Sequence, residues 1–226
     1  MTFRWWDRWG PLAGILSVAF MLAAFLVASN TPSSDDSDAK IATYFDKHSH
    51  QVSQIVGVFL FLAGILLLLA FFSALRSRLV AAEGEPGRLA ALALGAGVAN
   101  AVFWMTAIAL FVGPGLTAND SSKFRLDPNT YRLLNDTGYV FFVAAVAAGA
   151  LVVWATSAVA LRSGLLPRWF GWVGVAVGVL NLVGFFFIPT FIYWLWIIVT
   201  AALLVWRRRE PTPTAGPAGP PRQAAV

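Results

Sequence analysis

The sequence predicts an all-α membrane protein: a polytopic bundle of six transmembrane helices, with short interfacial helices in its two long outer loops. Composition is the first reason. Hydrophobic residues make up 58% of the 226-residue chain and charged residues only 12%, whereas a soluble domain carries about 25% charged residues. The second reason is that the apolar residues fall in long charge-free runs, as a bilayer core about 30 Å thick requires of a crossing helix.

Four of the charge-free runs predict one span each, at about residues 11–30, 51–75, 89–113 and 137–161. The fifth run, residues 169–206, would be about 57 Å long as one helix, far more than one crossing needs. Pro189 lies near its midpoint, lacks a backbone donor and disfavours helix in the residue before it. We therefore predict a hairpin with spans at 171–188 and 190–206, and a single strongly kinked helix is the alternative.

The distribution of positive charge predicts the orientation. With six spans, one side of the membrane carries both termini and most of the basic residues, including Arg76, Arg78, Arg88, Arg162 and Arg168. Basic residues accumulate on the cytoplasmic side, so residues 1–10 and the Pro/Gly-rich tail 207–226 are expected there. The tail has too few apolar residues to fold and is expected to be disordered. At its start, Arg207, Arg208 and Arg209 are expected to attract anionic lipid headgroups.

The two outer loops each carry a helix-start signal. In the first loop, Asp36 or Ser37 can cap a helix with one apolar side, formed by Ile41, Tyr44, Phe45, His48 and Val52. In the second, "LDPNTYRLLND" (126–136) offers Asp127 as a cap and Pro128 at the first helical position. The two short helices are expected to pack together as a small cover on the bundle.

Both histidines lie in the first of these helices, and the chain has no cysteine. Helical residues two apart point about 200° away from each other, so His48 and His50 cannot bind one ion together. His50 shares a predicted helix face with Asp46, which makes Asp46 and His50 the weak candidates for a metal site. Pairs at this spacing on a helix surface are mostly structural, and we expect neither a metal nor another cofactor.

Catalytic signatures are missing from the sequence. It contains no H-E-x-x-H, G-x-S-x-G, Walker or dinucleotide-binding motif. No charged residue lies within a predicted span, although ion-coupled transport usually needs one. The net charge of +5 follows the positive-inside bias and does not indicate a nucleic-acid partner. We therefore expect a protein that is not an enzyme.

Neutral polar and small residues mark the interior of the predicted spans: Asn100, Trp104, Trp154 and Asn181. They either hydrogen-bond between helices or line a cavity for a neutral or amphiphilic ligand. Gly171, Gly174, Gly178 and Asn181 share one helix face, and Gly174 with Gly178 forms a G-x-x-x-G pair that lets another helix approach closely. We predict that this face packs against the third or fourth span, and that the opposite Val/Leu face contacts lipid.

Three segments carry a resemblance: "GPLAGILSVAF" (10–20), "YFDKHSHQVSQIVGVFLFLAGILLLLAFFSALR" (44–76) and "GEPGRLAALALGAGVANAVF" (84–103). They resemble small multi-pass membrane proteins of actinobacteria that are catalogued as a domain of unknown function. The resemblance implies a bacterial plasma-membrane protein with no assigned activity.

For function, we expect a non-enzymatic structural or interaction component of the plasma membrane. Its partners would be membrane lipids, with a protein partner or a second copy of the chain as a further possibility. A small transporter or binding protein for a neutral or lipophilic compound is the alternative interpretation. A membrane-embedded enzyme is the third.

Overall fold

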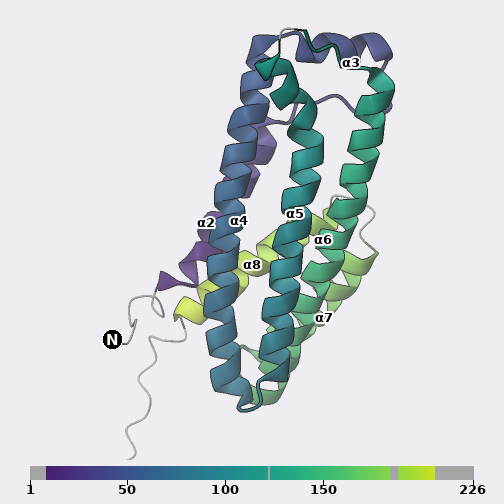
Figure 1. Ribbon diagram of the computed structural model, residues 1–226. Coiled ribbons are helices and arrows are strands. Elements are labelled where there is room, and N and C mark those ends of the chain that lie inside the picture. Colours follow the sequence, from purple (N-terminus) through teal and green to yellow (C-terminus); the bar gives the residue numbers. More distant parts are fainter. Residues whose placement is uncertain (1–8, 122, 184–187, 207–226) are drawn as a thin grey trace, which may run out of the picture.

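The computed structural model describes residues 9–121, 123–183 and 188–206, and within these ranges the protein is all-α with no strand. The predicted all-α class is therefore confirmed. The helices are α2 (Leu12–Val27), α3 (Asp38–Phe45), α4 (His48–Glu83), α5 (Arg88–Asp120), α6 (Pro128–Ser163), α7 (Arg168–Leu182) and α8 (Ile188–Trp206) (Figure 1).

Each predicted span corresponds to one helix, but the helices differ in length. Four of them, α4, α5, α6 and α8, are long and apolar enough to cross a membrane. The other two, α2 with 16 residues and α7 with 15 residues, are shorter apolar helices. A 15-residue helix is only about 22 Å long, so four crossings follow from length and composition, and six remain a prediction.

The helices form a closed ring of neighbours. Each of α2, α4, α5, α6, α7 and α8 packs against the next in chain order, and α8 packs back against α2. Figure 1 shows α3 lying across one end of the long helices α4, α5 and α6, while α7 and α8 lie beside the other half of the bundle. We call these the α3 end and the opposite end.

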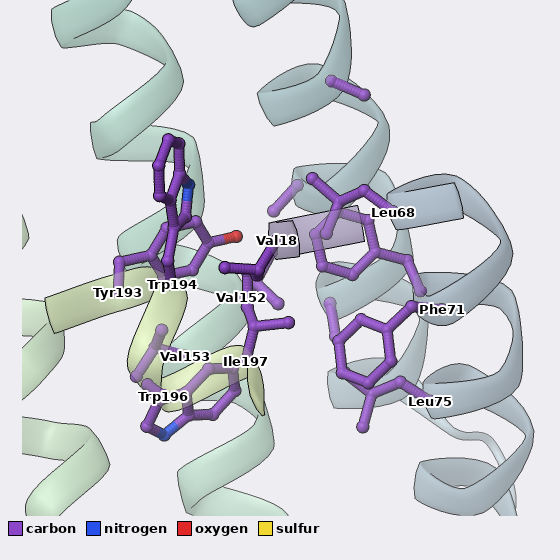
Figure 2. Close-up of a cluster of buried hydrophobic side chains, with 14 of the residues drawn as sticks. Val18, Leu68, Phe71, Leu75, Val152, Val153, Tyr193, Trp194, Trp196 and Ile197 are labelled. Carbon is purple, nitrogen blue, oxygen red and sulfur yellow. The ribbon is translucent and has the colours of Figure 1, made fainter. Parts of the chain in front are cut away.

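Apolar side chains fill the middle of the ring. Figure 2 shows Leu68, Phe71 and Leu75 of α4 on one side of this cluster and Val152 and Val153 of α6 on the other. Val18 of α2 and Ile197 of α8 lie between them. All seven side chains are at most 1% exposed, so the core joins helices from both halves of the chain.

The N-terminal caps of α3 and α6 are the predicted ones. The Ser37 hydroxyl accepts the Lys40 N–H at 3.3 Å, and the Asp127 carboxylate accepts the Thr130 N–H at 2.8 Å. From Pro128, however, α6 continues without a break to Ser163. The prediction of a separate short helix in the second outer loop was therefore wrong. No proline follows Pro128 in this segment to interrupt the helix, and Gly138 packs against the Phe111 ring of α5.

The first outer loop also differs from its prediction. The chain leaves the helical conformation at Lys47, whose φ of −88° and ψ of 116° are extended, and α4 begins at His48. The apolar stripe expected along one helix is therefore divided between α3 and α4. Ile41, Tyr44 and Phe45 of α3 form a buried cluster with Tyr131 of α6, so the two outer segments do pack together.

The fifth charge-free run forms two helices, as predicted, but the break comes earlier than expected: α7 ends at Leu182 and α8 begins at Ile188, so Pro189 lies inside α8. The Phe170 ring, near the start of α7, stacks on the Trp196 ring of α8 with centroids 6.1 Å apart and planes 9° apart. A single kinked helix could not bring these two side chains together, because they are 26 positions apart in the sequence, or about 39 Å along one helix. Residues 184–187, between the two helices, lie outside the described residues.

Candidate ligand-binding cavity

A cavity of about 410 Å³ lies near the α3 end of the bundle. Its walls come from α2, α4, α5, α6 and α8 and from the segment that joins α2 to α3. Ligand cavities in proteins typically measure about 300–1,000 Å³, so the volume suits a small organic compound.

Seven of the described lining residues are aromatic. Trp104 of α5 is 5% exposed, and its ring centroid lies 5.3 Å from that of Phe61 and 6.1 Å from that of Trp194. Phe191 contacts Trp194 edge-on at 5.5 Å and Phe25 at 5.7 Å. Such rings offer flat apolar surfaces and polarised edges to a ligand.

A polar segment closes the cavity at the α3 end. We call residues 28–37 the strap, and Ser29, Thr31, Ser33 and Ser34 of the strap line the cavity. The Gln54 side chain of α4, also in the wall, donates to Thr31 Oγ1 at 2.6 Å. The cavity thus has a hydrogen-bonding end and an aromatic body.

Side chains at the start of α6 hold the strap in place. Tyr131 Oη donates to the Pro32 carbonyl at 2.6 Å. The Arg132 guanidinium donates to the carbonyls of Ser34 and Asp36, at 3.0 Å each, and pairs with the Asp38 carboxylate at 2.7 Å. A strap without helix or strand is therefore fixed by three hydrogen bonds donated from α6, and the ion pair with Asp38 holds the adjoining start of α3.

The described residues that line the cavity are all uncharged. Charged groups lie just behind the wall: the Arg132 guanidinium of α6 donates to the Ser34 carbonyl at 3.0 Å, and Lys40 of α3 pairs with Asp36 of the strap at 2.8 Å. The hydrogen bond from Lys40 holds the pKa of the Asp36 carboxyl below its ordinary value, helped by the Ser33 N–H. An ionised ligand inside the cavity would lose its hydration without gaining an opposite charge, so the wall favours an uncharged compound.

Asp46 and His50 do not share one helix in the structure. Asp46 ends α3 and is not in α4, so the shared helix face predicted for Asp46 and His50 does not exist. No group of three or more His, Asp or Glu residues that could hold a metal occurs in the described ranges. His50 instead stacks on the Tyr44 ring at 4.1 Å, with Nδ1 2.9 Å from the Tyr44 carbonyl. The sequence had placed His48, not His50, against Tyr44.

Of the four polar residues predicted inside the spans, two link helices by hydrogen bonds and one lines the cavity. Asn100 donates to the Ala145 carbonyl of α6 at 2.7 Å, and Trp154 donates to the Val175 carbonyl of α7 at 3.1 Å. These two link helices. Trp104 lines the cavity. Asn181 is 2% exposed, and neither end of its amide has a partner among the described residues.

The glycine face of α7 packs inside the bundle against α6, the fourth predicted span. A Cβ added to Gly174 would overlap Ser157, and one added to Gly178 would overlap the Trp154 indole. The close approach predicted for the G-x-x-x-G pair is therefore confirmed. The opposite face is exposed as predicted, at Val173, Val179 and Leu180, whereas Val177, which lies beside the glycines, is only 5% exposed.

Several residues of the site were not singled out from the sequence, among them the strap residues, Gln54, Asn135 and Thr190. A partial signal was present on α5, where Trp104, Ile108 and Phe111 recur at helical spacing and all line the cavity. The Arg207–Arg209 cluster lies outside the described residues.

A comparison with protein families, curated proteins and solved structures found no match to this chain.

Proposed function

We propose that the chain is a six-span protein of the bacterial plasma membrane that binds an uncharged amphiphilic compound in this cavity. The single observation that carries the proposal is the cavity itself, with an aromatic body, a polar strap at one end and no charged residue in its described wall. Such a wall complements a ligand that has an apolar body and a neutral hydrogen-bonding end.

The distribution of exposed side chains supports the six-span topology. Trp9, Trp169, Trp172 and Trp206 are each more than half exposed, and all four flank helix ends at the opposite end of the bundle, as an interfacial aromatic belt does. A bilayer accommodates helices as short as α2 and α7 by thinning locally. The arginines at this end favour a cytoplasmic location for it and for both termini, where Arg207–Arg209 would contact anionic headgroups. The strap would then face outward.

The cavity favours a binding protein over the structural component expected from the sequence. A bundle with a purely structural role has no need for an internal space, because protein interiors otherwise close-pack with few voids larger than water. The third interpretation, an enzyme, finds no support in the cavity wall, which presents hydroxyls, amides and rings but no ionisable acid–base pair.

Photolabelling tests the proposal. A 1-O-alkylglycerol carrying a diazirine in its chain is added to the protein in phosphatidylcholine vesicles, and labelled peptides are mapped by mass spectrometry. We expect labels on the strap and on residues 104–112 of α5, and loss of these labels when excess unlabelled alkylglycerol is added. Matched probes with a carboxylate or a trimethylammonium head should label the same peptides several-fold less.

A cavity-filling variant and a matched control sharpen the test. Ala28 lines the cavity, so Ala28→Phe should reduce the competed labelling. Ala109 is exposed on α5 and is not in the wall, so Ala109→Phe should leave it unchanged. Labelling confined to lipid-facing residues such as Phe59, or equal labelling in both variants, would show that the cavity is not a binding site.

A further inference from the structure

Three residues in the cavity wall carry buried polar atoms that lack a hydrogen-bond partner in the described part of the chain. They are Trp104 Nε1, Thr190 Oγ1 and Trp194 Nε1, in residues that are 5%, 3% and 4% exposed. Thr190 and Trp194 lie one turn apart on α8, and the Trp194 and Trp104 rings are neighbours at 6.1 Å. The three side chains therefore belong to one part of the wall.

These atoms are donors in a region that offers them no acceptor. An indole N–H can only donate, and a threonine hydroxyl can donate or accept. Buried tryptophans usually find a hydrogen-bond partner, and an unpartnered polar group costs free energy in an apolar surrounding. A helical carbonyl can accept a second hydrogen bond, as the Val175 carbonyl does from Trp154, but these three atoms have no such partner in the described part of the chain. All three atoms are buried, so a ligand in the cavity can supply the missing acceptor only after the side chains turn toward it.

We propose that the ligand is an uncharged amphiphile with a hydrogen-bond acceptor, a carbonyl or ether oxygen, at the end of its body that lies against Trp104, Trp194 and Thr190. The inference rests on the proposed function and adds the chemical class of the ligand. The polar head of the compound lies at the strap, and its second oxygen lies among the two indoles. A purely hydrocarbon body leaves the three donors unpaired and binds more weakly.

Buried donors discriminate strongly between compounds. A site built to hydrogen-bond a ligand group rejects an analogue that lacks the group, because its own polar atoms are then left unpaired. A ketone and a methylene differ little in size, so a matched pair isolates this contribution. The matched pair is a 1-O-alkylglycerol with a keto group in the distal third of the chain and its methylene counterpart, used as competitors of the diazirine probe.

We expect the keto compound to compete at an at least about tenfold lower concentration than the methylene compound. Trp104→Phe and Trp194→Phe keep an aromatic ring but remove the N–H, and Thr190→Val keeps the shape but removes the hydroxyl. Each variant should reduce the preference for the ketone while labelling by the probe persists. Trp172→Phe is the control, because Trp172 is 67% exposed and outside the wall, and it should keep the full preference.

Equal competition by the two compounds in the unmodified protein would overturn the inference while leaving the cavity a binding site. A ketone preference that survives in all three wall variants would overturn it as well. Failure of both compounds to compete at all contradicts the proposed function, and the inference falls with it. Because three separate variants are compared, one that does not fold, as shown by its melting curve, still leaves two that decide the question.

Discussion

At the scale of single residues, the contact between α6 and α7 depends on Gly178. Its missing Cβ makes room for the Trp154 indole, which in turn donates to the Val175 carbonyl at 3.1 Å. We predict that Gly178→Ile lowers the unfolding free energy in detergent by about 1–3 kcal/mol or more, the usual cost of overpacking. The measurement is a thermal or denaturant melt followed by tryptophan fluorescence.

The control for this experiment is Val179→Ile. Val179 is 51% exposed, so an added methylene meets no protein atoms and should change stability little. The neighbouring Val177 is unsuitable, because it lies beside the glycine face and is only 5% exposed. The pattern shows which residues share a face but not how wide the contact with other helices is. Equal stability of the two Ile variants would contradict the packing role of Gly178.

At the scale of an element, Glu83 links the end of α4 to the start of α5. Its carboxylate accepts the N–H groups of Leu89 and Ala90, both at 2.9 Å, and so caps two donors that a helix start leaves free. We predict that Glu83→Ala destabilises this turn, because both N–H groups lose their cap. Hydrogen exchange at Leu89 and Ala90 should accelerate, whereas Glu85→Ala, an exposed change in the same loop, should leave it unaltered.

The strap is the second element whose order depends on one side chain. Arg132 donates to two of its carbonyls and pairs with Asp38. We predict that Arg132→Gln increases amide exchange in residues 33–38 several-fold, because the shorter neutral side chain cannot span these contacts. Exchange within α4 should stay the same. Lys123→Gln, a loss of one exposed charge nearby in the sequence, serves as control, and equal exchange in both variants would contradict a fixing role for Arg132.

The sequence predicted the positions of the helices much better than their ends. A charge-free run stops at its first charged residue, whereas a helix continues as long as its backbone hydrogen bonds do. This is why α4 passes Arg76 and Arg78 to reach Glu83, and why α6 begins at Pro128. The cavity was beyond prediction for another reason. Its wall is formed by residues as distant in the sequence as Phe25, Trp104 and Trp194, and no local sequence pattern predicts that such residues lie close together.

At the scale of the whole molecule, the two halves of the bundle differ in their buried polar groups. Among the described residues, the buried side-chain polar atoms without a partner all lie on α5, α6, α7 and α8. On α2, by contrast, the buried Ser17 hydroxyl donates to the Gly14 carbonyl at 2.8 Å. The buried polar groups of α2 and α4 thus have hydrogen-bond partners, whereas α5 to α8 carry buried donors and acceptors that have none among the described residues. Ligand recognition is therefore expected from the α5–α8 half, with α2 and α4 completing the wall.

The orientation of the molecule yields the last prediction. The chain has no cysteine, so a single introduced thiol reports on its position without background. Ser33, Lys123 and Ala81 are all exposed, the first two toward the α3 end and the third at the opposite end. If both termini are cytoplasmic, Ser33→Cys and Lys123→Cys should react with a membrane-impermeant maleimide in intact cells, and Ala81→Cys should react only after the membrane is opened. Labelling of Ala81→Cys in intact cells, with Ser33→Cys protected, would show that the orientation is the reverse of the predicted one. Labelling of Ser33→Cys but not Lys123→Cys would instead place the two loops on different sides and contradict the six-span topology.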